Sequence, residues 1–195
     1  MAIVGAIRVA PTTSSTAERI GAAWVHATRS TRRVAVLSVL TSVVFGAMAP
    51  VAPAARCAVA ASGCVIALAA LVDVRERRLP NRLVVLALCC TLAPLLLGAP
   101  ADVVRVGAGT LIAGGLLLGV RLRRGVGMGD VKLGAVIGGN VALVALPAAP
   151  VAVAVAAASA ALVGGVLRRS SLPLGPALWF GWAVAVATAG SGWWT

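Results

Sequence analysis

Two aspartates stand where a long apolar segment meets a basic stretch, and they are the residues of this sequence best placed to do chemistry. Asp73 ends one apolar segment and Asp130 begins another. The chain holds only 5 acidic residues. Of the other three, Glu18 lies in a polar N-terminal region, Glu76 lies among arginines, and Asp102 lies in a short predicted loop. An ionisable group beside an apolar membrane segment is costly, and such groups commonly have a function.

A pair of carboxylates at close range supports acid–base chemistry. Two carboxylates a few ångströms apart cannot both ionise, so one pKa rises and the pair shares a proton. The ionised member can take a proton from water while the protonated member polarises a carbonyl group. Taken singly, either aspartate also fits an ion pair with arginine, and Asp130 fits a cap at the positive end of a helix. Because a coupled pair titrates as a unit, the sequence does not assign the acid and the base.

The composition predicts that membrane helices position these aspartates. The chain of 195 residues is 61% hydrophobic and 11% charged, and its mean hydropathy is +1.03. A soluble domain is about 45–50% apolar and about 25% charged. Because lipid offers the backbone no hydrogen-bond partners, we expect an all-α, polytopic transmembrane bundle. About seven helices are predicted, over residues 34–52, 57–73, 83–98, 103–120, 131–146, 149–167 and 174–192.

The distribution of basic residues predicts the orientation of these helices. The net charge is +12, but the basic residues are spread between apolar segments rather than gathered on one surface, so we expect no nucleic-acid partner. With the N-terminus in the cytoplasm, every Lys and Arg except Arg56 and Arg105 falls on the cytoplasmic side. The positive-inside rule therefore predicts an N-in, C-out topology. Span 57–73 then runs inward and span 131–146 runs outward, which places Asp73 and Asp130 at the same membrane face.

Two regions are predicted along the chain. Residues 1–33 are expected to form a basic cytoplasmic tail, either disordered or resting on the membrane surface, and residues 34–192 the membrane domain. The four cysteines all lie in apolar segments and none forms a Cys-x-x-Cys pair, so no zinc site is expected. They are Cys57, Cys64, Cys89 and Cys90.

Three stretches resemble the motifs of a known family. Residues 127–130, Gly-Met-Gly-Asp, match the GxGD pattern of intramembrane aspartyl proteases. Asp73, followed by Leu-Pro-Asn at 79–81, resembles the first aspartate motif of type IV prepilin peptidases, also called prepilin leader peptidases. Residues 127–133 are close to the second motif of that family. Residues 172–178 look like its late Pro-Phe-Gly-Pro stretch, with leucine in place of phenylalanine.

This resemblance, which covers roughly residues 57–190, implies a site. Asp73 and Asp130 would be the catalytic pair. Five further residues would bind substrate or shape the site: Gly127, Gly129, Pro80, Asn81 and Lys132. The glycines would let the backbone pass close to the substrate or to the other aspartate. The Pro-Asn pair would shape the loop after the first aspartate, and the lysine would hold a carboxylate or meet anionic lipid.

The resemblance also implies an activity. The family cleaves the basic leader of prepilins or prepilin-like pseudopilins at the cytoplasmic face of the inner membrane. The expected partners are this substrate and membrane lipid, with no metal and no cofactor. Larger members carry a cysteine-rich cytoplasmic segment and methylate the new N-terminus. This chain has no such segment, so we expect the short form, with cleavage and without a zinc site. The sequence leaves open whether methylation occurs and favours its absence.

Other classes of function are less well supported by the residues. The residues needed for zinc or serine hydrolysis are missing. No His-Glu-x-x-His motif occurs, and the single histidine, His26, lies in the predicted tail. The presenilin-like branch uses a Tyr-Asp motif, and the chain contains no tyrosine. An ion- or proton-coupled transporter would be favoured by an inverted repeat, and the two aspartate segments differ in sequence. A non-catalytic pilus or secretion assembly partner would be favoured by loss of an aspartate, and both are present.

Overall fold

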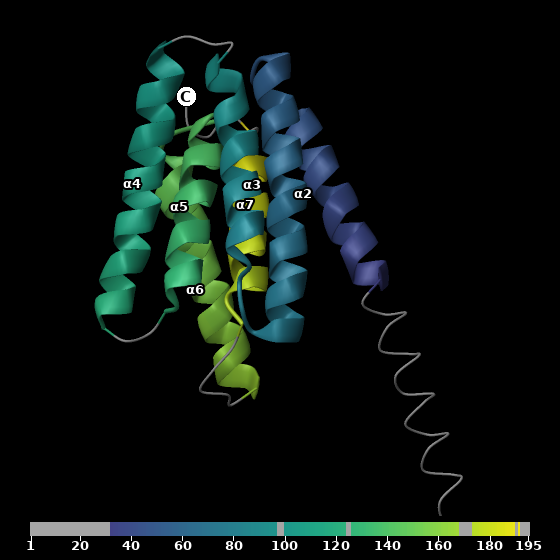
Figure 1. The fold of residues 1–195 in the computed structure, drawn as a ribbon, viewed down its shortest axis with the longest axis vertical. Helices are drawn as coiled ribbons and strands as arrows, with labels where there is room; N and C mark the ends of the chain where they lie inside the picture. Colours follow the sequence, from purple (N-terminus) through teal and green to yellow (C-terminus); the bar gives the residue numbers. More distant parts are fainter. Residues whose placement is uncertain (1–31, 97–99, 124–125, 168–172, 190, 192–195) are drawn as a thin grey trace, which may run out of the picture. The chain divides into compact units, whose positions relative to one another are not determined.

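The protein is all-α in a computed structural model that describes residues 32–96, 100–123, 126–167, 173–189 and 191. After a helix over residues 32–48, six α-helices follow (Figure 1): α2 Pro53–Glu76, α3 Asn81–Leu92, α4 Pro100–Leu122, α5 Met128–Ala142, α6 Ala148–Leu167 and α7 Gly175–Ala189. A short 3-10 helix, η1 Ala93–Leu96, continues α3. No strand occurs in these residues. The predicted helical fold is confirmed, and each of the seven predicted spans overlaps one of these α-helices.

Residues Leu37–Thr195 form one compact unit, which contains both aspartates. The other unit is Met1–Val36, of which the structure describes only the helical residues 32–36. The predicted tail, 1–33, lies almost entirely outside the described residues. The division into tail and membrane domain and the N-in, C-out orientation stay predictions.

The helix ends follow from local backbone chemistry. Pro53 opens α2, where its missing N–H is not needed. The same helix ends at Glu76, and the next residue, Arg77, adopts the left-handed conformation with φ 51° and donates its N–H to the Asp73 carbonyl. This cap ends the helix within one turn of Asp73. Pro94 lies in η1, where the α-helix gives way because proline cannot donate to the preceding turn.

Glycines bring α4 and α5 into backbone contact. A Cβ on Gly109 would collide with the carbonyl oxygen of Gly138, and a Cβ on Gly138 would collide with that of Gly109. Gly134 lies one turn before Gly138 on α5 and leaves room for the Leu117 side chain of α4. Small residues at such spacing allow membrane helices to approach closely. The start of α5, which carries Asp130, is therefore held against a long neighbouring helix.

The outer surface of the helices is apolar. Three helical stretches are long and apolar enough to cross a membrane, Pro53–Glu76, Asp102–Leu122 and Ala148–Val166, and Asn81–Leu96 and Gly175–Ala189 are shorter apolar helices. Large apolar side chains such as Leu111 and Leu162 are exposed. Exposed apolar surface on helices of this length is what a bilayer covers. These features are those of a membrane protein.

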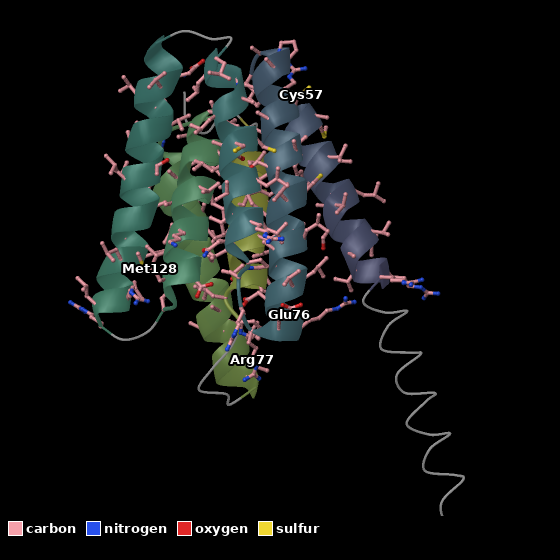
Figure 2. All side chains as sticks on the ribbon, viewed as in Figure 1. Cys57, Glu76, Arg77 and Met128 are labelled. Atoms are coloured by element: carbon pink, nitrogen blue, oxygen red, sulfur yellow. The ribbon has the colours of Figure 1, made fainter. Side chains whose placement is uncertain are left out.

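The ends of three helices meet on one side of the bundle. Asp73 lies in the last turn of α2, Asp130 in the first turn of α5, and Gly175 is the first residue of α7. Figure 2 shows the labelled neighbours of the aspartates, Glu76 and Met128, toward the same end of the bundle, and Cys57 at the other end. The antiparallel course of α2 and α5 thus brings the two aspartate segments together.

Candidate functional site

Asp73 is a buried carboxylate held by the start of α7. Its side chain is 6% exposed. Its Oδ2 atom accepts a hydrogen bond of 2.9 Å from the backbone N–H of Gly175. The first N–H groups of a helix have no partner within the helix and carry its positive dipole end, so they favour a negative charge. The α7 terminus therefore binds and orients the Asp73 carboxyl group.

Asp130 lies in the first turn of α5 and is partly buried. Its Oδ2 atom accepts a hydrogen bond of 3.2 Å from the backbone N–H of Gly127, the residue that precedes the helix. This contact is a helix cap, one of the roles that the sequence allows for Asp130. The cap uses only the Oδ2 atom of the Asp130 carboxyl group, and the Oδ1 atom takes no part in it.

The charge of Asp73 acts on the carboxyl group of Asp130. Asp130 lies outside the three helices that are long enough to cross a membrane and precedes the predicted span 131–146. Burial of its carboxyl group first, and the negative charge of Asp73 second, raise the pKa of Asp130 to about 6, against the opposing effect of the Gly127 N–H. The structure therefore brings the two predicted aspartates close enough for one charge to act on the other.

Close approach of the backbone explains two of the site glycines. A Cβ on Gly127 would lie 3.0 Å from Asp130 Oδ2, and a Cβ on Gly129 would lie 3.1 Å from the Cβ of Leu79. Both distances are tighter than ordinary side-chain contact. Gly129 thus lets the start of α5 approach the loop that follows Asp73. The role expected of the two glycines toward the substrate stays a prediction.

The remaining predicted residues lie at the beginning of α3 and in the first turns of α5. Pro80 precedes α3, and its carbonyl accepts the N–H of Leu83 at 3.0 Å. Asn81 and Lys132 both line a surface pocket of about 380 Å³. The other lining residues are mostly apolar: Val84, Val85, Leu88, Thr110, Ala135 and Val136. This pocket can take an apolar segment of a ligand beside two polar side chains.

Gly175 is a part of the site that was not predicted from the sequence. A Cβ on this residue would lie 2.9 Å from Asp73 Oδ2 and 3.0 Å from the Ala70 Cα atom, so the position has no room for a side chain. The stretch 172–178 resembles a family motif, but the resemblance gave no role to the glycine. The available signal was a glycine placed just before Pro176 at the start of an apolar segment.

The arrangement can perform acid–base chemistry with the groups present. Asp73 accepts a hydrogen bond from the α7 terminus, and Asp130 holds its proton to a higher pH than an ordinary aspartate. Within the described part of the chain, no group of three or more His, Cys, Asp or Glu side chains could hold a metal ion. The aspartates form a pair with distinct environments, which is the usual basis for separate acid and base roles.

The fold places the chain among helical membrane proteins, and comparison with protein families defines it further. Residues 60–167, more than half of the chain, match the type IV leader peptidase family. The protein therefore belongs to the type IV leader peptidase family, and the resemblance seen in the sequence motifs is confirmed. The matched region contains both aspartates. Searches of curated proteins and of solved structures gave no match.

Proposed function

We propose that the protein is an aspartic endopeptidase that removes the basic leader from prepilins or pseudopilins at the cytoplasmic face of the inner (plasma) membrane. Family membership supports a leader peptidase. The observation that carries the two-aspartate mechanism is that the end of α2 and the start of α5 bring Asp73 near Asp130, so that the charge of Asp73 contributes to the raised pKa of Asp130.

In the proposed reaction Asp73 is the general base and Asp130 is the general acid. The Asp73 carboxylate takes a proton from a water molecule as the water oxygen bonds to the scissile carbonyl carbon. Asp130 donates its proton to the carbonyl oxygen, which forms a neutral tetrahedral intermediate. The proton on Asp73 then passes to the leaving nitrogen as the carbon–nitrogen bond breaks, and the hydroxyl proton returns to Asp130. The cycle consumes one water molecule and restores both groups.

Substrate binding is assigned to the pocket next to the pair. An apolar segment of the substrate would lie against Val84 and Val136, and Asn81 and Lys132 would meet polar groups of the peptide near the scissile bond. Gly127 and Gly129 have no side chains, so the peptide backbone could pass close to the protein backbone at these two positions. Lys132 also suits the phosphate of an anionic lipid when no substrate is bound.

The cytoplasmic location is supported by charge. The chain segments next to the site carry Arg75, Arg77, Arg78 and Arg82 on one side and Arg121, Arg123 and Lys132 on the other. Basic segments of this kind remain in the cytoplasm during membrane insertion. The end of the bundle that holds the aspartates would therefore face the cytoplasm, where the basic leader of the substrate also lies.

The test is cleavage of a co-expressed prepilin from the same genome, read as a shift in size on a gel. The wild-type protein is compared with Asp73→Asn and Asp130→Asn, which keep a carbonyl oxygen for the N–H bonds and remove the titratable group. Asp102→Asn, a change of the same kind in the first turn of α4, is the matched control. We expect cleavage by the wild type and the control only. Cleavage by either variant at comparable protein levels would contradict the mechanism.

A further inference from the structure

A chain of buried hydrogen bonds crosses the bundle away from the aspartates. The Trp182 indole N–H donates to Asn140 Oδ1 at 2.8 Å, and Asn140 Nδ2 donates to Thr91 Oγ1 at 3.3 Å. The Thr91 hydroxyl lies 3.2 Å from the Ser62 hydroxyl, and the carbonyl of Ala87 accepts from both hydroxyls. The four side chains are almost completely buried. They come from α7, α5, α3 and α2 respectively.

The proposed mechanism uses none of these polar groups, but three of the four helices that supply them also carry residues of the proposed site. Asp73 is on α2, Asp130 is on α5, and Gly175 is on α7. A polar group buried in an apolar environment is costly when it loses its partner, so a fully satisfied network favours one arrangement of its helices. Both ends of the Asn140 amide are satisfied here. The network therefore opposes sliding of α7 along α5.

The spacing along the helices connects this network to the site. Trp182 follows Gly175 by two turns of α7, a rise of about 10 Å. A slide of α7 by one residue, about 1.5 Å, would break the 2.8 Å bond of the Trp182 indole and the 2.9 Å bond between Gly175 and Asp73 together. Gly63 of α2 adds a steric limit, because a Cβ at that position would collide with the Trp182 ring.

We infer that Trp182 and Asn140 are positioning residues, which set the depth of α7 against α2 and α5 and thereby hold the Gly175 N–H on the Asp73 carboxylate. This inference rests on the proposed function of Asp73. Buried residues in the middle of α7 would thus affect the reaction, because the start of the same helix supplies the Gly175 N–H that orients Asp73.

The test compares Trp182→Phe with Trp179→Phe on the same helix. The Trp179 indole donates to the Ser42 hydroxyl at 3.1 Å, and Ser42 keeps a second partner, the Ser38 carbonyl, at 2.8 Å. In Trp182→Phe the buried Asn140 Oδ1 loses its donor, so α7 is no longer held at the depth that places the Gly175 N–H on Asp73. We therefore expect kcat to fall about tenfold with KM nearly unchanged. We expect Trp179→Phe to stay within about twofold of the wild type.

Amide hydrogen exchange reports the Gly175 contact directly. Labelling with leucine carbonyl ¹³C and glycine ¹⁵N selects glycines that follow a leucine, among them Gly134 and Gly175. We expect Trp182→Phe to raise the exchange rate of the Gly175 amide about tenfold, because a lost bond of about 1.4 kcal/mol corresponds to that factor. The rate at Gly134, within α5, should not change. Equal increases at both amides would indicate a loss of global stability and would overturn the inference.

The double variant Trp182→Phe with Asn140→Leu separates positioning from folding. It removes both partners and leaves no unpaired carbonyl, so it should fold nearly as well as the wild type. We expect its cleavage and its Gly175 protection to stay low. Full recovery of both would show that the network serves folding alone. If Asp73→Asn abolishes cleavage while Trp182→Phe behaves as wild type, only the inference fails. If Asp73→Asn still cleaves, the proposed function fails first.

Discussion

The backbone N–H of Gly175 donates a 2.9 Å hydrogen bond to Oδ2 of Asp73, across 102 residues of sequence. A backbone donor differs from a lysine or an arginine at the same place, because it orients the carboxyl group without adding a full charge. It also belongs to a helix terminus, whose position is fixed by packing of the whole helix. The orientation of the proposed base therefore depends on α7 as a rigid body.

Gly175→Ala tests this relationship at the site. The new Cβ would lie 2.9 Å from Asp73 Oδ2 and 3.0 Å from the Ala70 Cα atom, so α7 or the carboxylate must move. We expect kcat to fall at least about tenfold while KM changes little, since a misplaced catalytic group lowers turnover rather than substrate binding. The measurement is steady-state cleavage of a purified prepilin.

Gly165→Ala on α6 is the matched control for that experiment. A Cβ at Gly165 would meet no atom within 4 Å. Alanine also has the higher helix propensity, by about 1 kcal/mol. The control should retain full activity and equal or greater thermal stability. Equal activity of the two alanine variants would contradict a positioning role for Gly175.

The pH dependence of cleavage follows from the raised pKa of Asp130. Asp130 must be protonated to act as the acid, and its pKa is raised to about 6, first by burial and second by the charge of Asp73. We expect kcat/KM to fall as the pH rises through about 6, because this quantity reports the free enzyme. An apolar substrate segment over the site would bury Asp130 further, so the corresponding fall in kcat should occur at higher pH. A flat profile of kcat/KM between pH 5 and pH 8 would exclude Asp130 as the acid.

The same pKa gives a prediction for stability. A carboxyl group whose pKa is higher in the folded state contributes stability at low pH, and this contribution is lost as the pH rises through the folded-state value. Asp130→Asn replaces the titrating group by a neutral one of the same shape. We expect this variant to be more stable than the wild type above pH 6 and equally stable below pH 4. Thermal unfolding in detergent across this range measures the difference, and a variant that is less stable at pH 8 would contradict the prediction.

Much of the fold could be predicted from the sequence, because lipid forces each apolar segment to form a helix. The alternating direction of the spans also predicts that Asp73 and Asp130 share one membrane face. In the structure Asp73 lies in the last turn of α2 and Asp130 in the first turn of α5, on one side of the bundle. The helix that carries Asp73 continues to Glu76, so this aspartate lies inside the last turn rather than at its end. The left-handed cap at Arg77 decides that boundary, and a non-glycine residue gives little signal of such a cap.

Two features of the site could not be found in the same way. The contact of Gly175 uses a backbone N–H, which every residue except proline possesses, so residue type does not reveal it. The pair of Trp182 and Asn140 depends on the packing of α5 against α7. One signal was present, since Asn140 is a polar residue within a predicted apolar span. Membrane orientation, substrate and the catalytic roles of the aspartates stay predictions.

A steric rescue tests the approach of α5 to the loop after Asp73. A Cβ on Gly129 would lie 3.1 Å from the Leu79 Cβ. We expect Gly129→Ala to lower kcat moderately and Gly129→Val to lower it by about tenfold or more, because the loop can yield only slightly. Leu79→Ala should restore much of the activity of the valine variant by opening the space. Cleavage assays of the single and double variants measure this, and an absence of rescue would place the effect of Gly129 elsewhere.

Filling the pocket beside Lys132 tests where the substrate binds. Val85 is an exposed side chain that lines this pocket of about 380 Å³. Val85→Trp should occupy much of the space and raise KM for a full prepilin about tenfold, with kcat nearly unchanged, because the apolar segment loses its contact surface. A short peptide that contains only the leader and the scissile bond should be cleaved as before.

Val163 is a comparable exposed valine in a pocket of about 370 Å³ between α6 and α7, so Val163→Trp is the control. Equal KM values for the two tryptophan variants would exclude the pocket beside Lys132 as the binding site, whereas a selective effect of Val85→Trp would place the apolar part of the substrate next to Asp130.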